Sequence, residues 1–424
     1  MRDHLPKFAS LVGVCVSLMA CSAHADSLPA NGEGCRLVIA GGALAPETES
    51  VWKAFIDGAR PEGNIVIIPA ASGYPAGSTQ SVTETLIKYG WPPSRIAGLP
   101  LAVEDDPDTP ETDESEWAAN VTSPSVREAL EGAAAIWFTG GDQARIAKLF
   151  GTRDNPAQLL ELTDASCAAG AAIGGTSAGA AIMSHPMLRG GDSLPALLGE
   201  EDPSKGALQI GAGLGFFRDG IVDQHFGERA REGRLITAIL DQNDRSMRIG
   251  FGVDENTAMV VSSAGVIDVM GEGHVTIIDA RAAVAQRAEN GALRAEGLLL
   301  HMLARGDSYD TKTRRISPAE WRKSTVGREY VEAAAISGFG MAVPAAGLSE
   351  ALGEGLVDNS AATFIERLTF PAGRGEQTGL SFSFTQLDQS QGYWGRDDRG
   401  IAAYTIANIR LDIRPVSLTL EDLE

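Results

Sequence analysis

Short apolar runs that alternate with amphipathic stretches constrain the fold of this chain more than any other feature. Continuous apolar strands that alternate with helices are typical of a parallel sheet covered on both faces. Such runs, each ending in glycine or other small residues, occupy positions 35–44, 64–72, 133–143 and 171–184. Helical periodicity follows the first three runs, at 48–58, 78–91 and 144–150. We therefore predict an α/β fold with a mostly parallel sheet flanked by helices, in which ligands bind at the carboxyl ends of the strands.

Two later segments break this alternation. The stretch from Glu104 to Glu116, EDDPDTPETDESE, is acidic and contains prolines, so we expect a solvated loop there. After about Ala345 the chain shows alternating apolar residues and turn signals, which predict a small strand-rich C-terminal appendage. The expected domains are therefore residues 26–345 for the α/β part and 346–424 for the extension.

The first 25 residues are typical of a secretory signal peptide. A basic start precedes an apolar run at 8–19, and Ala23-His24-Ala25 forms a small-x-small cleavage site. An alternative is a lipoprotein cleavage box that ends at Cys21, with a lipid anchor on that cysteine. The apolar run is too short for a permanent membrane span, and no later run is long enough for one. An exported chain could pair Cys35 with Cys167.

The segment GGTSAGA places Ser177 between an expected buried strand and a helix rich in small residues. Acyl transfer needs such a sharp turn, because it exposes the hydroxyl while neighbouring backbone N–H groups face the developing oxyanion. The alternative is a glycine-rich turn that only lets strand and helix approach, with Ser177 as a helix cap.

A serine nucleophile needs a base, and the chain has six histidines. Two lie in the signal region, His185 is expected at the end of the helix after Ser177, His274 in a late strand and His301 in a helical apolar run. His225 follows the strand-like GIVDQ and is the favoured base, since it lies at the same sheet edge as Ser177. Asp254 and Glu255 are both candidates for the orienting acid. The order Ser, His, acid disfavours an α/β-hydrolase, which uses Ser, acid, His.

Four segments together resemble the signature segments of cyanophycinases: FTGGDQ (138–143), GGTSAGA (174–180), DQHFGERAREGR (223–234) and GVDENTA (252–258). Cyanophycinases are serine peptidases related to bacterial aspartyl dipeptidase and, more distantly, to class I glutamine amidotransferases. The resemblance extends over about 37–278. It implies a glutamine-amidotransferase-like, flavodoxin-like sheet and an enzyme that needs no metal or organic cofactor.

The resemblance also assigns roles to individual residues. It implies Ser177 as nucleophile, His225 as base and Glu255 as orienting acid, with an oxyanion hole from backbone N–H groups at Gly141 and Ala178. The implied substrate contacts are Gln143, Asp223, Gln224, Arg229, Arg231 and Arg234. The implied substrate is cyanophycin, a polyaspartate with arginine on each side chain, which is cut to beta-Asp-Arg dipeptides. An aspartyl or isoaspartyl dipeptidase and a non-catalytic polymer-binding surface protein remain as alternatives, and a homodimer is left open.

The charge pattern agrees with a zwitterionic polymer. The chain carries a formal net charge of −21, which disfavours nucleic acid as a partner and attracts guanidinium groups. The arginines after His225 can bind carboxylates through two parallel hydrogen bonds. We therefore predict that this arginine cluster binds the carboxylates of the polymer and that the acidic remainder of the chain attracts its guanidinium groups.

Overall fold

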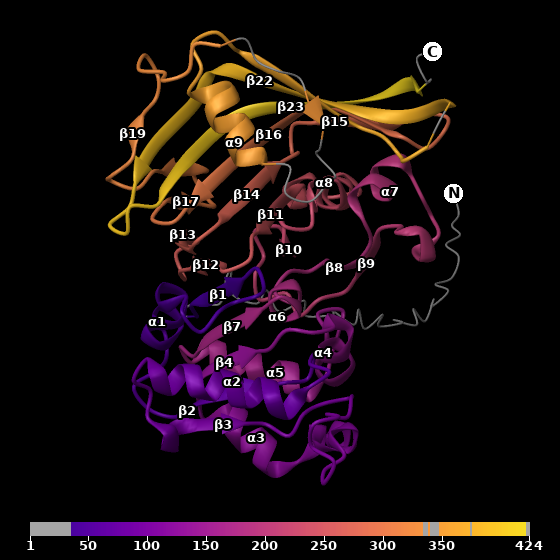
Figure 1. The fold of residues 1–424 in the computed structure, drawn as a ribbon. Coiled ribbons are helices and arrows are strands. Elements are labelled where there is room, and N and C mark those ends of the chain that lie inside the picture. The colour runs from indigo at the N-terminus through magenta and orange to yellow at the C-terminus, as the bar shows by residue number, and fades with distance from the viewer. Residues whose placement is uncertain (1–34, 334–337, 340–346, 374, 421–424) are drawn as a thin grey trace, which may run out of the picture.

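The computed structural model describes residues 35–333, 338–339, 347–373 and 375–420. The predicted signal peptide and Cys21 lie outside these residues. Two large sheets dominate the molecule (Figure 1). One carries the helices expected of the α/β part, and the other contains the long strands of the C-terminal region. No helix in the described residues is long and apolar enough to cross a membrane.

The first sheet contains nine strands, five of them parallel. Its order is β18-β17-β13-β12-β1-β7-β4-β2-β3. The parallel strands are β1 (Leu37–Ala40), β7 (Ala172–Thr176), β4 (Ala133–Phe138), β2 (Asn64–Ile68) and β3 (Ile96–Gly98). The antiparallel strands are β12 (Thr257–Val261), β13 (Val266–Gly271), β17 (Ser308–Asp310) and β18 (Arg315–Ser317). The α/β fold with a parallel sheet is confirmed, extended by an antiparallel half.

Helices cover both faces of the parallel strands, because alternate strand residues point to opposite sides. In β1, Val38 joins a core with helices α1 (Glu49–Asp57) and α2 (Pro75–Lys88). Ile39 joins a second core on the other face. That core contains residues of α3 (Pro124–Glu131), α4 (Gln143–Phe150), α5 (Gln158–Ala168) and α6 (Ala178–Ala181).

The second sheet has a path of eight strands in the order β10-β11-β14-β16-β23-β22-β21-β20. These are β10 (Ile221–Gln224), β11 (Ile249–Val253), β14 (His274–Asp279), β16 (Leu293–Ala304), β23 (Ala402–Leu420), β22 (Gly375–Arg396), β21 (Phe364–Thr369) and β20 (Gly338–Phe339). Strand β15 (Val284–Arg287) pairs with β16, and β19 (Lys323–Ser324) pairs with β22. Helices α7 (Ser193–Leu198), α8 (Glu232–Leu240) and α9 (Leu348–Leu352) contribute to its core.

Shorter elements connect these layers. The short strands are β5 (Gly151–Thr152), β6 (Asn155–Pro156), β8 (Met187–Gly190) and β9 (Gln209–Gly211). The 3₁₀ helices are η1 (Pro93–Arg95), η2 (Glu114–Thr122), η3 (Pro203–Lys205) and η4 (Arg245–Met247), and η5 (Gly353–Val357) is a π-helix.

The two sheets share one apolar core, which fixes the position of one sheet relative to the other. Phe251 of β11 packs edge-to-face against Phe217, with ring centroids 5.1 Å apart, and also contacts Tyr309 of β17. The same core includes Ile39 and Phe138 of the parallel strands. Because this core is continuous, it holds the end of β7 in the first sheet at a fixed position relative to the ends of β10 and β11 in the second sheet.

The strands on either side of residue 345 belong to the same sheet. β16 lies before that position, yet it pairs along its length with β23 of the C-terminal region. The strand-rich character expected after Ala345 is confirmed, but β22 and β23 have 22 and 19 residues, more than a small appendage suggests. The domain boundary at 345 itself stays a prediction.

The acidic run at 104–116 is more ordered than a solvated loop. Asp106 and Glu114 are both buried. Oδ2 of Asp106 accepts the N–H groups of Ala76 and Gly77 at 3.1 and 3.2 Å, in the first turn of α2. The prediction of a solvated loop was therefore wrong for these two acids. Asp106 satisfies N–H groups at a helix N-terminus, and Glu114 accepts the backbone N–H of Asp106 and the hydroxyl of Thr109.

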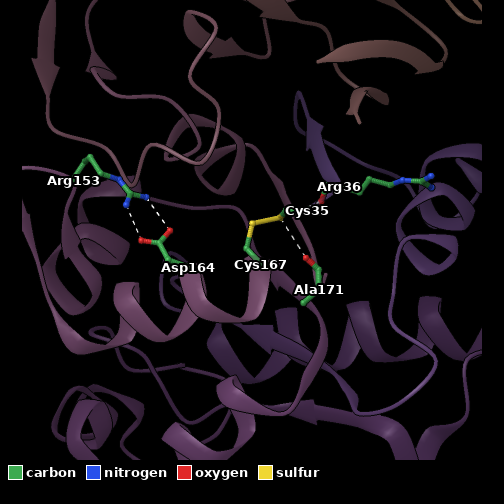
Figure 2. Close-up of a disulfide and its surroundings, with 6 residues drawn as sticks. All are labelled: Cys35, Arg36, Arg153, Asp164, Cys167 and Ala171. Carbon is green, nitrogen blue, oxygen red and sulfur yellow. Dashed lines mark hydrogen bonds and ion pairs between the residues drawn. A yellow bond between two sulfur atoms is a disulfide. The ribbon is translucent and has the colours of Figure 1, made fainter. Parts of the chain in front are cut away.

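A disulfide joins the start of the parallel sheet to the end of α5. Cys35 and Cys167 are bonded, with their Cα atoms 5.0 Å apart and a sequence separation of 132 (Figure 2). Nearby, Arg153 donates two hydrogen bonds to Asp164 at 2.7 and 3.1 Å. The pairing that the sequence left open is therefore made in the structure.

Candidate active site

Ser177 lies at a sharp turn between β7 and α6. Its φ of 53° and ψ of −110° are rare for a non-glycine residue and cost on the order of 1–3 kcal/mol. A Cβ atom on Gly175 would lie 2.6 Å from the carbonyl oxygen of Gly179. Strand and helix thus approach so closely that these two positions require glycine, which is the geometry of a nucleophile turn.

Side chains from three strand ends form a hydrogen-bonded chain. Oγ of Ser177 lies 2.9 Å from Nε2 of His225, and Nδ1 of His225 lies 2.5 Å from Oε1 of Glu255. His225 follows β10 and Glu255 follows β11, and these strands are parallel neighbours. Their carboxyl ends therefore bring both residues to one edge. The arrangement provides a nucleophile, a base and an acid that orients the base.

Asp254, the other acid considered from the sequence, has a different environment. Its two carboxylate oxygens accept the backbone N–H groups of Gly227 and His274, each at 2.9 Å. Burial raises its pKa. Asp254 therefore ties the loop after His225 to strand β14, while Glu255 contacts the imidazole.

The loop after β1 holds the catalytic segments together. Carbonyl oxygens of residues 40–42 accept the N–H groups of Ser177, His225 and Asn256 at 3.1, 2.6 and 3.0 Å, in that order. A Cβ atom on Gly42 would lie 2.3 Å from Nε2 of His225. Sequence reasoning missed this role of the loop. Its signal is the glycine pair at the end of the first strand.

The expected oxyanion site lies beside Ser177. A Cβ atom on Gly140 would be 3.3 Å from the Cβ atom of Ser177, so the FTGGDQ loop passes next to the nucleophile. Among the described residues, the N–H groups of Gly141 and Ala178 donate no hydrogen bond. Both donors are therefore available to a developing oxyanion.

His225 is held in the neutral form that a general base requires. Burial lowers the pKa of its imidazole, and the positive charges of Arg229 and Arg231 lower it further. The hydrogen bond to Glu255 acts in the opposite direction but does not outweigh burial. The lowered pKa favours the neutral imidazole, which is the form that can accept the Ser177 proton.

The two glutamines expected to contact substrate have different surroundings: Gln224 lies next to Ser177, and Gln143 binds the backbone of strand β8. Oε1 of Gln224 lies 3.4 Å from Oγ of Ser177. Gln143 is buried and donates from Nε2 to the carbonyl oxygens of Leu188 and Arg189, at 2.9 and 3.0 Å. Gln143 thus fixes strand β8 relative to α4.

Asp223 and Arg234 form a buried ion pair. Nε and Nη2 of Arg234 donate to the two carboxylate oxygens at 2.8 and 2.5 Å, and Nη1 donates to the carbonyl oxygen of Gly191 at 2.9 Å. Arg234 is 5% exposed and Asp223 is 1% exposed. Every nitrogen of this guanidinium is engaged, which favours a positioning role for Arg234.

The other two arginines of the segment are more available to a ligand. Arg231 donates from Nη1 to the carbonyl oxygen of Gln224 at 2.5 Å, and burial lowers its pKa to about 10. Arg229 is exposed, and within the described part of the chain its side chain has no hydrogen bond or ion pair. Arg229 is therefore the cation of this segment best placed to meet an incoming anion.

The remaining described histidines do not hydrogen-bond Ser177. The prediction of His185 in the helix after Ser177 was wrong, because α6 ends at Ala181, and Nε2 of His185 lies 3.2 Å from Oδ1 of Asp154. His274 is in strand β14, as expected. His301 lies in strand β16, pairs with Ile277 and accepts the backbone N–H of Asn408 on Nδ1 at 3.0 Å. The prediction of a helix around His301 was wrong, because a short apolar run does not distinguish a buried helix from a buried strand.

Known proteins resemble the part of the chain that holds this site. Residues 116–269 match the family described as Peptidase family S51. A cyanophycinase from Trichormus variabilis is 36% identical over 208 residues, which cover 48% of this chain and 65% of the relative. A cyanophycinase from Geminocystis herdmanii is 38% identical over 194 residues, covering 44% and 66%. The chain thus spans just under two thirds of the length of these curated relatives.

Two solved structures are also similar to parts of this chain. A peptidase from an acI-B1 Actinobacterium is 20% identical, with a TM-score of 0.45, over 66% of this chain and 98% of that one. A Listeria monocytogenes protein described as a putative peptidase E is 15% identical, with a TM-score of 0.33. Residues 116–269 are thus similar to peptidase family S51, and the curated relatives similar to this chain are cyanophycinases.

Proposed function

We propose that the protein is a serine peptidase that hydrolyses cyanophycin to beta-Asp-Arg dipeptides. The observation that carries this proposal is the hydrogen-bonded chain from Ser177 through His225 to Glu255. The relatives that match this part of the chain are cyanophycinases. The exposed Arg229 supplies a cation for the free carboxylate that each repeat of the polymer carries.

The triad geometry assigns each proton transfer in the proposed reaction. His225 takes the Ser177 proton on Nε2 as Oγ attacks the scissile amide carbon, and Glu255 holds Nδ1–H in place. The N–H groups of Gly141 and Ala178 bind the oxyanion. The imidazolium then protonates the leaving amine, which leaves an acyl-enzyme on Ser177. Water, deprotonated by His225, releases the acyl group and restores the free serine.

A comparison of wild type with Ser177→Ala tests the reaction. Wild-type enzyme incubated with insoluble cyanophycin should release a product whose mass and fragmentation match beta-Asp-Arg. Ser177→Ala should fold, sediment with the polymer and release no dipeptide, because the nucleophile is absent. Dipeptide release by that variant at the wild-type rate would refute the assignment. Cleavage of Asp-containing dipeptides with no action on cyanophycin would favour the dipeptidase alternative.

We also propose that the chain is exported. The basic and apolar start of the sequence supports this, and so does the Cys35–Cys167 disulfide, since disulfides persist mainly in oxidising compartments. N-terminal sequencing of protein from the producing cell separates the two processing routes. A mature chain that begins at Asp26 supports a secreted form, and a lipid-modified chain that begins at Cys21 supports an anchored one. A homodimer remains a prediction for sedimentation analysis.

A further inference from the structure

A cavity of about 230 Å³ lies behind the catalytic acid, between helix α8, strand β14 and the start of α9. Its volume is far larger than the about 30 Å³ that one water occupies in the liquid. Glu228 and Gly347 on its rim are exposed, so the cavity is open to solvent there. Its lining includes Glu228, Glu232, Asp254, His274, Met302 and Leu348.

Glu232 is the clearest sign that this cavity takes a ligand. The residue is 6% exposed, and its Oε2 atom is buried without a hydrogen-bond partner in the described structure. A buried carboxylate oxygen normally has a donor, because removing it from water otherwise costs several kcal/mol. Burial raises the Glu232 pKa to about 8, and Asp254, Asp223 and Glu228 raise it too. The charged side chains that shift the Glu232 pKa are therefore all acidic, and none of them is a cation that could pair with Glu232.

The other polar groups in the cavity do not supply a cation. Burial lowers the pKa of His274 to about 4, so its imidazole is neutral at physiological pH. Its Nε2 atom is also buried without a partner. Among the described residues no cluster of histidines, cysteines and acids has the arrangement of a metal site. The cavity thus presents acidic side chains, and Glu232 becomes a carboxylate at pH 7 when a cation pairs with it. An organic cation matches this lining better than a metal ion.

The residue types in the lining favour one class of organic cation, a guanidinium on an aliphatic stem. Met302 and Leu348 provide an apolar wall for a carbon stem, next to the carboxylates of Glu228 and Glu232. A guanidinium carries five N–H donors in a plane and can bridge two carboxylates, whereas an ammonium is a compact, strongly hydrated charge. A guanidinium on an aliphatic stem therefore suits both parts of the lining.

The cavity is coupled to the catalytic centre through short contacts. Oε2 of Glu228 accepts the backbone N–H of Glu255 at 3.2 Å. Asp254 precedes Glu255 and binds the N–H of Gly227, two positions after His225. A ligand that engages Glu228 would thus act on a carboxylate that holds the backbone of Glu255 by a hydrogen bond.

We propose that this acidic cavity binds an alkylguanidinium group. Free arginine derivatives and the arginine side chains of a substrate present the same group, and binding experiments can separate these sources. Engagement of Glu232 satisfies its unpartnered oxygen and neutralises the surrounding negative charge.

Agmatine is the probe, because it carries an alkylguanidinium but no carboxylate to engage the arginines near Ser177. We expect agmatine to bind wild-type protein in calorimetric titrations at pH 7, and Glu232→Gln to weaken binding at least tenfold. Titration in buffers of different ionisation enthalpy should show proton release by wild type, since Glu232 must ionise to pair with the guanidinium. Cadaverine, which carries only ammonium groups, should bind at least tenfold more weakly than agmatine.

A matched control is Glu200→Gln, which removes the same charge elsewhere on the surface and should bind agmatine like wild type. Glu228→Lys, at the exposed rim, should abolish binding and replaces Glu232→Gln if that variant does not fold. No agmatine binding by wild type would overturn the proposal. So would equal weakening by Glu232→Gln and Glu200→Gln, or cadaverine binding as tight as agmatine binding.

A kinetic experiment identifies the source of the guanidinium, and only this part rests on the proposed function. If substrate arginine occupies the cavity, agmatine competes with cyanophycin and Glu232→Gln raises KM. If a free ligand occupies it, agmatine binding persists while KM is unchanged. Inactivity on cyanophycin would contradict the proposed function but would leave the agmatine titrations interpretable.

Discussion

The catalytic centre requires glycine at a position that contributes no side chain to the chemistry. Gly42 has a φ of 118° and lies against the imidazole of His225, while the carbonyl groups of residues 40–42 hold the segments of all three triad members. Two strained residues, Ser177 and His225, also have positive φ values. Such conformations persist only where surrounding contacts over-determine them. The loop after β1 supplies those contacts.

Gly42→Ala should therefore disable catalysis by displacing the base. The added methyl group would overlap the imidazole, and a displacement of about 1 Å can cost about 100-fold in rate. We expect kcat/KM to fall by about that factor or more on any acylating substrate. Gly90→Ala is the control, since Gly90 has a similar φ of 91° but open space around its Cβ position. Equal losses in both variants would mean that backbone strain, and not the contact with His225, decides the effect.

Together with the burial of His225, which lowers the imidazole pKa most, Arg229 should contribute to the lower pH limit of activity. Its positive charge lowers the His225 pKa, so Arg229→Gln should raise that pKa toward the usual value. Because the protonated imidazole is inactive as a base, the acidic limb of the kcat/KM profile should move to higher pH. The profile is measured with a small uncharged activated ester, so that polymer binding does not contribute. Arg245→Gln removes an exposed arginine elsewhere and should leave the acidic limb in place.

At the scale of elements, the parallel strand pair β10 and β11 sets the geometry of base and acid. The buried pair of Asp223 and Arg234 links the end of β10 to helix α8. Arg234→Met leaves a buried carboxylate without its main partner, which typically costs about 3–5 kcal/mol. We expect this loss in the free energy of unfolding, measured by chemical denaturation.

The double variant Asp223→Leu with Arg234→Met should recover part of that stability, since both charges of the pair are removed. Recovery is incomplete because Arg231, whose Nη1 lies 3.7 Å from Asp223 Oδ1, loses this partner. A substrate-binding role for Arg234 predicts a different pattern. In that case Arg234→Met would raise KM for cyanophycin while leaving the denaturation midpoint near the wild-type value. The two measurements together therefore separate positioning from direct recognition.

Local patterns predicted four of the five parallel strands and favoured Ser177 and His225, because these features depend on short segments, whereas the choice of Glu255 over Asp254 came from the family resemblance. Ser177, His225 and Glu255 each follow a buried strand, but β7 belongs to the first sheet and β10 and β11 belong to the second. The expectation that Ser177 and His225 share one sheet edge was therefore wrong, because strand patterns do not reveal which sheet a strand joins. The partner of β16 could not be predicted in this way, since it lies more than 100 positions away in β23. The same limit explains the error at His301. The burial of Asp106 depends on its contact with helix α2, which no local pattern reveals.

At the scale of the whole molecule, the C-terminal strands complete the second sheet. Leu298 and Leu300 of β16 share a core with Phe382 of β22 and Ile409 of β23. A chain that ends at residue 345 would expose this core and leave the edge of β16 unpaired. We therefore expect residues 26–345 alone to aggregate, as judged by size-exclusion chromatography. A soluble, active fragment of that length would instead support the predicted boundary at 345.

The disulfide should also keep the protein in one covalent piece after a single proteolytic cut between Cys35 and Cys167. The closed loop from Cys35 to Cys167 contains strands β1 to β4 and the acidic run at 104–116. A protease that cuts within that run would leave two fragments joined through sulfur, and both would remain in the same sheet. The nicked protein should migrate as one band without reductant and as two bands with it. Covalent closure thus gives the parallel sheet tolerance to proteolytic cleavage at its most acidic surface segment.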